Sequence, residues 1–522
     1  MTNLQNEDTK RKNIELEKLN DLLAKESHES VLNYKLSLRK KKIFNYIMES
    51  RMKNVDKNND NNKINNRKKY YEYKKLFEIG KIKETLDKLF LKTENANYMK
   101  DKKIIELIHL YSRNINTNDN VKNILGLNID KLIEKFLYEI INDIKSQSIN
   151  FELFDYYLII LGNLFIYKKS IYDNKNNEYL SLFLNILNMN SNLEIYNDYN
   201  FEIINNALWL IYLYIYFGDK NNISIFPFII KTVNNLFINR FFEELIKFSN
   251  TDKKKEINLG IIKEIIYSGI KIYLSIFENL IENNKKDKIN INMQKEDIQH
   301  CFDILIKMID FNLLKDVFNE DITYIISLIL ELSGNIFTLN LVQFYNIYIN
   351  LFEKYKNYDY DNNGISQNLI SILYCLIDKY YEDNYFFQIL NDSNIIQICI
   401  QYYLQNGSII NIVLSAINMI FKYPFNYHKI IIKSINYRLL NKVCEILINT
   451  INKEDIFYRC LNILINAYFF LENNMKNNNN ENILRYFDLK IIPKIEQLML
   501  HNDNYICEIA SFLYKKFKNI EI

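Results

Sequence analysis

Residues 151–167 read FELFDYYLIILGNLFIY, and apolar side chains occupy them almost without interruption. A helix of this composition keeps no broad polar face for water, so neighbours must bury it on several sides. Similar blocks, separated by short polar loops, follow at residues 131–144, 203–217, 261–281, 322–337, 368–381, 409–421, 456–471 and 506–518. We therefore predict an all-α protein in which such helices are stacked against one another.

The composition and the spacing of these blocks indicate a repeat array. The 522 residues include only 9 glycines and 3 prolines, too few for turn-rich β architectures or for the glycine loops of Rossmann-type enzymes. The place of Asn163 in its block recurs in later blocks at Leu213, Asn335 and Asn418, with gaps of 50, 122 and 83 residues. The first gap is lengthened by an insertion near Asn174, and the other two are the informative ones. These two gaps are close to three and two multiples of roughly 41 residues, a period typical of HEAT or armadillo repeats.

Charge divides the chain unevenly. Residues 1–70 contain 17 Lys or Arg against 10 Asp or Glu, a net charge of +7, whereas the whole chain carries +3. We predict a basic, helical N-terminal segment at residues 1–55, an Asn- and Lys-rich linker at 56–69, and the repeat array at 70–522. A basic end attached to a mildly acidic body could dock on acidic surfaces.

Motifs for chemistry are absent from the sequence. No phosphate-binding glycine loop, nucleophile elbow or HExxH pattern occurs, and the six cysteines are scattered without CxxC spacing. We expect no enzymatic activity, no cofactor and no metal, with the cysteines as buried free thiols. The N-terminus is polar and no apolar run reaches the roughly 18 residues that cross a bilayer, which favours a soluble cytosolic or nuclear protein.

The C-terminal sequence carries the most specific family resemblance. Residues 494–496 read KIE, and Leu498, His501, Ile506 and Ala510 follow at set distances. This pattern resembles the short final repeat of the importin alpha family. The resemblance implies a right-handed α-solenoid of about ten armadillo repeats that serves as a nuclear import adaptor in the cytoplasm and nucleus.

A second resemblance lies near the N-terminus. Residues 38–42 read LRKKK, similar to the core of the segment with which importin alpha binds importin beta, although Glu49 and Ser50 replace two basic residues of the family's later cluster. An ordinary charged helix face, a localisation signal or a nucleic-acid patch are the alternatives. The residues that would contact importin beta by this resemblance are Arg39, Lys40, Lys41, Lys42 and Arg51.

The family binds the nuclear localisation signals of its cargo through Trp and Asn side chains on successive third helices. Trp209 resembles one such Trp, although Leu213 replaces the Asn that should follow it. The resemblance implies a cargo-binding role for Asn163, Trp209, Asn335 and Asn418, and partners that include neither a membrane nor directly bound nucleic acid. A core position for Trp209 and generic polar positions for the asparagines are the alternatives.

The single tryptophan of the chain excludes a complete ladder of indoles. This departure, together with the two missing basic residues, leaves a second function class open. The chain could be an armadillo-repeat scaffold that binds another protein partner and has no role in transport.

Overall fold

The computed structural model describes residues 76–90, 98–146, 149–168, 177–191, 198–217, 223–237, 256–284, 295–310, 316–332, 341–356, 364–405, 409–451, 453–474 and 483–518. Every regular element in these ranges is a helix, so the prediction of an all-α protein is confirmed. The described residues form two compact units, the N-terminal unit, which ends at Met308, and the C-terminal unit, which begins at Ile309. The predicted segments 1–55 and 56–69 lie outside the described residues.

Within the described residues, each apolar block predicted from the sequence lies on one helix, apart from one or two residues at its ends. The N-terminal unit contains α3 (Ile79–Phe90), α4 (Lys102–Arg113), α5 (Asp119–Leu125), α6 (Ile129–Ser146), α7 (Phe151–Tyr167), α8 (Asn177–Ser191), α9 (Asp198–Phe217), α10 (Phe226–Leu236), α12 (Glu256–Asn284) and most of α13 (Lys295–Asp310). The C-terminal unit contains α14 (Asp316–Leu332), α15 (Val342–Tyr355), α16 (Gly364–Lys379), α17 (Asn384–Asp392), α18 (Ile395–Gln401), α19 (Ile410–Lys422), α20 (His428–Asn436), α21 (Leu439–Asn449), α22 (Glu454–Asn474), α24 (Ile492–Leu498) and α25 (Asn504–Lys518).

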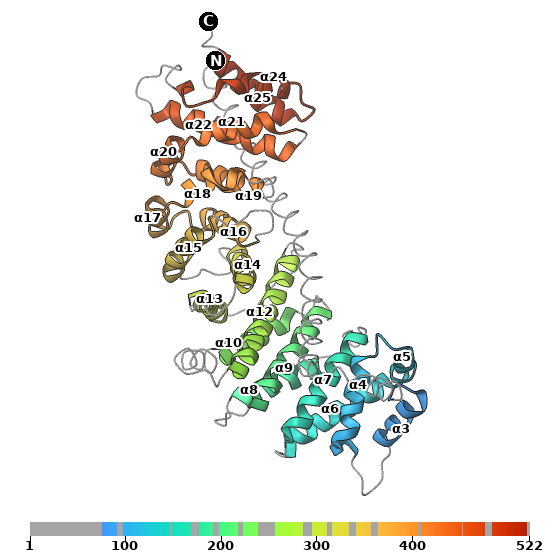
Figure 1. Ribbon diagram of the computed structural model, residues 1–522. Helices are drawn as coiled ribbons and strands as arrows, with labels where there is room; N and C mark the ends of the chain where they lie inside the picture. The colour runs from blue at the N-terminus through green and yellow to red at the C-terminus, as the bar shows by residue number, and fades with distance from the viewer. Residues whose placement is uncertain are drawn as a thin grey trace. The chain divides into compact units, whose positions relative to one another are not determined.

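A row of helices forms the centre of each unit. In the N-terminal unit α4, α7, α9 and α12 each contact the next, and α14, α16, α19, α22 and α25 do so in the C-terminal unit (Figure 1). We call these the core helices. In most cases the helix that precedes a core helix also packs against it, as α6 does on α7 and α21 on α22. A core helix inside a row therefore has neighbours on three sides, which accounts for its nearly uninterrupted apolar sequence.

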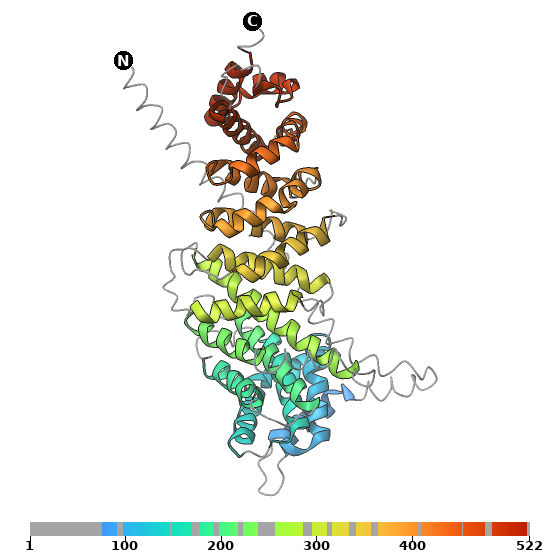
Figure 2. The same ribbon diagram turned by 90° about the vertical axis from the view of Figure 1, so that its left-hand side faces the viewer.

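Some core helices are the third helix of a three-helix group. In the C-terminal unit α17, α18 and α19 form one group and α20, α21 and α22 the next, each ending in the longest helix of the three. Core helices α16, α19 and α22 begin at residues 364, 410 and 454, which are 46 and 44 residues apart. Such spacing is typical of HEAT or armadillo units. Within each unit the packing is solenoid-like, with successive core helices side by side (Figure 2).

Tyrosine supplies much of the buried bulk. Ten of the twelve largest fully buried side chains among the described residues are tyrosines. Tyr157 Oη donates a hydrogen bond of 2.5 Å to the Met99 carbonyl, and Tyr273 Oη donates one of 2.7 Å to Asn234 Oδ1. A buried phenol needs such a partner, and the bond ties its helix to a neighbour. The many tyrosines therefore fit a helical core despite their preference for strands.

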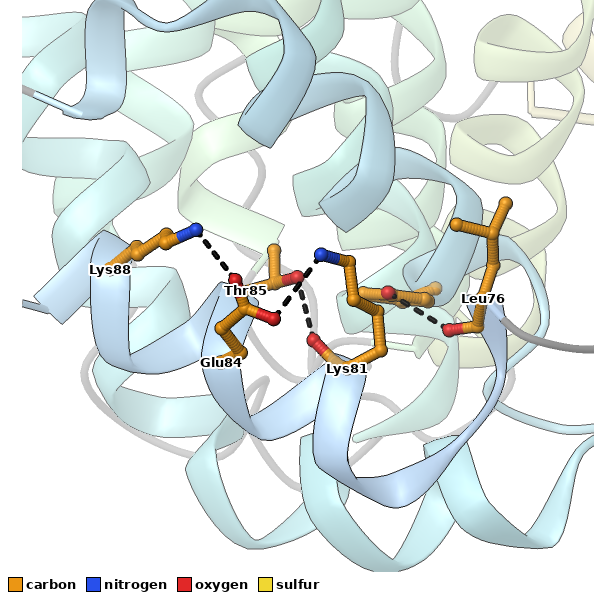
Figure 3. A network of polar contacts seen from close by, with 6 residues as sticks. Leu76, Lys81, Glu84, Thr85 and Lys88 are labelled. Atoms are coloured by element: carbon orange, nitrogen blue, oxygen red, sulfur yellow. Dashed lines mark hydrogen bonds and ion pairs between the residues drawn. The ribbon is translucent and has the colours of Figure 1, made fainter.

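Polar contacts hold the start of α3 against α4. Tyr111 Oη of α4 donates a 3.0 Å hydrogen bond to the Leu76 carbonyl, just before α3 begins. On the exposed side of α3, Glu84 lies between Lys81 and Lys88, with N–O distances of 3.2 and 2.6 Å (Figure 3). Exposed ion pairs of this kind contribute little to stability, so the buried apolar side of α3 dominates its docking.

The prediction of buried free thiols is confirmed for all but one of the cysteines. Five of the six are buried, and all six are free thiols. Burial raises the pKa of the Cys444 thiol to about 12, which keeps it protonated and unreactive near neutral pH. The buried ones are Cys301, Cys375, Cys399, Cys444 and Cys460, whereas Cys507 is half-buried.

Gly162 of α7 lies directly beneath the indole of Trp209 of α9. A Cβ added at Gly162 would lie 1.8 Å from Trp209 Cζ3. We predict that Gly162→Ala lowers the free energy of unfolding by about 1–3 kcal/mol, because overpacking at a helix contact outweighs the better helix propensity of alanine. Urea denaturation measures this change.

Gly80 in α3 is the matched control, because a Cβ there would meet nothing within 4 Å. Gly80→Ala should leave the free energy of unfolding unchanged or raise it by up to about 1 kcal/mol. If both substitutions stabilise the protein equally, the packing of Trp209 on Gly162 is wrong.

Candidate functional site

The fourth side of each core helix is not covered by its row. On α7 the partly exposed side chains recur every three or four residues, at Glu152, Tyr156, Ile159, Asn163 and Tyr167. This spacing places them on one stripe of the helix. We call the corresponding stripes of the core helices in one unit its open face.

Side-chain contacts join the core helices along the open face of the N-terminal unit. Between α4 and α7, Lys102 Nζ lies 2.5 Å from Glu152 Oε1, and the rings of His109 and Tyr156 have centroids 5.3 Å apart. These contacts fix the register in which the helices present their stripes. Further along, Asn206 Nδ2 donates a 2.5 Å hydrogen bond to Asp155 Oδ1.

The contacts continue from α9 to α12. Asn205 Nδ2 donates to Glu264 Oε2 over 3.1 Å, and Asn205 Oδ1 accepts a 2.9 Å hydrogen bond from Ser268 Oγ. The NH2 and the carbonyl oxygen of one side-chain amide are thus both bonded to α12, which aligns the two helices. On α12, Lys271 Nζ lies 4.7 Å from the centroid of the Tyr267 ring, a cation–π geometry.

Carboxylates outnumber cations on the open face of the N-terminal unit. The cations at or beside its stripe positions are Lys102, Lys103, Arg113, Lys168 and Lys271. The carboxylates at or beside the stripe positions are Glu106, Glu152, Asp155, Glu202, Glu264, Glu278 and Glu282. Because several of them are partly buried, their field is less screened than that of isolated surface charges. The net charge at these positions is therefore negative.

Tyr156 lies among these carboxylates. Burial raises the pKa of its phenol, and the nearby charges of Glu106 and Glu152 raise it further. The ring is only half-buried, so one part of it remains accessible. An accessible aromatic ring surrounded by carboxylates suits the stem and the ammonium or guanidinium group of a Lys or Arg side chain.

The open face of the C-terminal unit is richer in amides and hydroxyls. Asn368 Nδ2 donates to the Glu320 carbonyl over 2.8 Å and links α16 to α14. Arg459 of α22 is almost completely buried, and its Nε donates a 2.7 Å hydrogen bond to Ser415 Oγ of α19. Burial lowers the pKa of Arg459. A buried, hydrogen-bonded guanidinium at this place ties α22 to α19 and makes the face less acidic.

Two of the predicted cargo-binding residues lie on neighbouring core helices of the N-terminal unit. Asn163 is half-buried on the open face of α7, and its Nδ2 donates a 3.1 Å hydrogen bond to Ser112 Oγ. Trp209 is only 3% exposed and its ring covers Gly162. The indole is therefore used in packing and offers no open slot, as the alternative of a core tryptophan predicted. Leu213, which replaces the family's Asn, is buried as well.

Asn418 lies in the C-terminal unit, on the open face of α19. It shares its stripe with Asn411 and Ser415. The Oδ1 atoms of Asn411 and Asn418 are buried and have no hydrogen-bond partner among the described residues. The predicted residue Asn335 and the basic residues Arg39, Lys40, Lys41, Lys42 and Arg51 lie outside the described residues.

Sequence reasoning missed the carboxylates of the open face. Each of them interrupts an apolar block singly, and Asp and Glu on helices are exposed by default, so none of them stood out. The available signal was the spacing of charged residues. Glu264, Lys271, Glu278 and Glu282 on α12 recur at intervals of four and seven residues, which places them on one side of the helix. The same signal would have grouped Tyr156 with Glu152 on α7.

Comparisons with known proteins do not extend this description. No family model matches the sequence, and no curated protein matches it either. None of the helices in the described ranges has the length and apolar character needed to span a bilayer. Within the same ranges, no group of three or more His, Cys, Asp or Glu is placed to hold a metal ion.

His109 makes a pH dependence of stability testable. Burial lowers its pKa to about 4, with a further contribution from the Arg113 charge, whereas an unfolded chain titrates near 6.5. Between these values the unfolded state binds a proton that the folded state does not, so stability is lost as the pH falls from about 6.5 toward 4. We predict that His109→Phe, which keeps a ring beside Tyr156, removes on the order of 1 kcal/mol of this loss between pH 7.5 and pH 5.

Urea denaturation of both proteins at the two pH values measures the effect. Other groups titrate in the same range, so the informative quantity is the difference between the two pH dependences. If wild type and His109→Phe lose the same stability, His109 is not buried in its neutral form.

Proposed function

We propose that the chain is a peptide-binding adaptor whose N-terminal unit holds an extended, basic segment of another protein on its open face. The observation that carries the proposal is the excess of carboxylates there, around the accessible ring of Tyr156. Enzymatic chemistry has no comparable support among the described residues. A repeat array that lines up its core helices suits a partner that lies across them in extended form.

The repeat dimensions match an extended peptide. Packed helices lie about 8–10 Å apart, and an extended chain advances about 3.3 Å per residue. Each core helix therefore meets about three residues of the partner, and a row of four meets about twelve. An exposed ion pair contributes only about 0.2–1 kcal/mol, so recognition requires several cationic side chains spaced along the partner.

Tyr156 supplies the most specific position of the proposed site. A Lys or Arg stem can pack on its ring while the charged end meets Glu106 or Asp155. This arrangement takes the place of an indole slot, which the buried Trp209 does not provide. The position lies between α4 and α7, beside the ring of His109.

The finer form of the proposal follows from the resemblance to importin alpha. The chain would be a right-handed solenoid of about ten armadillo repeats that carries proteins with nuclear localisation signals from cytoplasm to nucleus and docks on importin beta through Arg39–Lys42 and Arg51. The three-helix groups and their 46- and 44-residue spacing support this architecture. Ile495, Leu498, Ile506 and Ala510 of the C-terminal pattern are all buried, which suits a closing repeat.

A scaffold without a transport role is the second candidate, and the burial of Trp209 favours it. Binding to importin beta separates the two. An importin alpha-like adaptor should bind purified importin beta as the full chain and lose that binding when Arg39, Lys40, Lys41 and Lys42 are all replaced by Ala. A scaffold of the second kind should not bind importin beta even at low salt, yet should still bind a basic peptide.

Charge reversal on the open face tests peptide binding. We predict that Glu106→Lys combined with Glu202→Lys weakens the binding of a fluorescent peptide with several Lys and Arg by at least tenfold, because two attractive charges become repulsive. Fluorescence anisotropy at low salt measures the affinity. The weakening should shrink as salt is added.

Two exposed carboxylates of α3 provide the control. Glu84→Lys combined with Asp87→Lys changes the net charge by the same amount outside the row of core helices. It should weaken binding by less than about threefold. Equal losses in the two double variants would show that only net charge matters, and the proposed site would be wrong.

A further inference from the structure

One stretch of the C-terminal unit is strongly basic. Residues 422–453 contain six Lys or Arg and a single acid, Glu445, whereas the described range 364–405 contains four acids and one Lys. The basic stretch covers the end of α19, all of α20 and α21, and the turns that join them. Four of its cations, Lys429, Lys433, Arg438 and Lys442, lie on or between the first and second helices of one three-helix group.

The exposed side of α20 combines cations with apolar side chains. Lys429 and Lys433 are exposed, and Ile432, between them, is 41% exposed. Phe425 in the preceding turn is 94% exposed. The turn before α20 is closed by a hydrogen bond of 3.1 Å from the Tyr427 N–H to the Tyr423 carbonyl. Lys429, Ile432 and Lys433 share one side of α20, and Phe425 lies in the turn that precedes it. We call these four residues the ridge.

Two more cations follow the ridge along the chain. Arg438 is exposed between α20 and α21, and Lys442 follows one turn later, 2.7 Å from Glu445. Lys433 donates a 2.5 Å hydrogen bond to the Asn391 carbonyl, which leaves its charge uncompensated. Among the described residues, no carboxylate forms an ion pair with Lys429, Lys433 or Arg438.

The ridge lies on a different side from the open face. α20 packs against α17, α18, α19 and α21, and its remaining side is exposed. In Figure 1 α15, α17 and α20 follow one another along one side of the C-terminal unit, while α14, α16 and α19 lie on the other. A partner of the ridge therefore does not need the open face.

We infer that the ridge formed by Phe425, Lys429, Ile432 and Lys433, with Arg438 just after α20, docks the protein on the surface of an anionic lipid membrane. Lys429, Lys433 and Arg438 attract acidic head groups, and Phe425 and Ile432 enter the boundary between head groups and acyl chains. The proposal departs from the expectation, stated from sequence, that the chain has no membrane partner. It does not depend on peptide binding by the N-terminal unit.

Lipid fits the ridge better than nucleic acid does. Bases stack on flat aromatic platforms, whereas Ile432 offers them nothing and occupies the middle of the cationic side. A protruding Phe at 94% exposure is costly in water and gains most by entering an apolar phase. Electrostatic attraction brings the protein to the membrane surface. Insertion of the two apolar side chains then adds a hydrophobic contribution to the binding free energy, which salt does not screen.

Vesicle flotation tests the inference. The full chain should float with vesicles of phosphatidylcholine and phosphatidylserine at low salt and remain unbound with phosphatidylcholine alone. Lys429→Gln combined with Lys433→Gln should weaken binding by about fivefold for each lysine. Phe425→Ser should weaken it by on the order of tenfold and leave the salt dependence unchanged.

Matched controls separate the ridge from general charge and from folding. Lys490→Gln combined with Lys515→Gln removes two exposed cations elsewhere in the C-terminal unit and should change vesicle binding by less than twofold. All variants should keep the wild-type circular dichroism spectrum and thermal unfolding midpoint. Absence of binding to anionic vesicles, equal losses in the control, or binding of single-stranded RNA that Lys429→Gln and Lys433→Gln abolish while vesicles stay unbound would each overturn the inference.

Discussion

The burial of each core helix on three sides is the constraint on which the rest of the structure depends. A helix such as α7 is apolar almost all round, so it is stable only between α4 and α9 with α6 packed against it. Packing at these contacts is tight enough that Gly162 receives the ring of Trp209. Because every core helix needs its neighbours, the helices of a unit support one another in sequence, as expected for repeat proteins.

The same constraint creates the open face. Three covered sides leave one stripe for polar residues, and stacking brings the stripes of successive helices together. In the N-terminal unit these stripes carry carboxylates around Tyr156, and in the C-terminal unit they carry amides, hydroxyls and the buried Arg459. The first and second helices face elsewhere, so α20 can present Lys429 and Lys433 independently. The burial of core helices on three sides thus leaves two kinds of surface, the open faces of the core helices and the exposed sides of the first and second helices.

The sequence predicted the helices well and the site only in part. Apolar blocks located every core helix except α4, because burial on three sides leaves an apolar pattern that is visible even in a chain rich in Ile and Tyr. The sequence could not predict whether the Trp209 side chain is buried or lines a groove. Both arrangements use the same stripe of α9, and they differ only in which residue of the neighbouring helix faces the indole. Here Gly162 lies opposite, one repeat earlier in the chain. The grouping of the carboxylates likewise depends on how neighbouring helices are aligned, which the sequence of a single block does not determine.

Hydrogen–deuterium exchange, read helix by helix, tests most directly whether the core helices both hold the fold and carry the binding surface. In the free protein the slowest amides should lie in α7, α9, α16, α19 and α22, with faster exchange in α17 and α20. Addition of a basic peptide should slow exchange further in α4, α7, α9 and α12 only. Slowest exchange in the first helices of the groups, or protection by the peptide confined to helices outside these rows, would contradict the account.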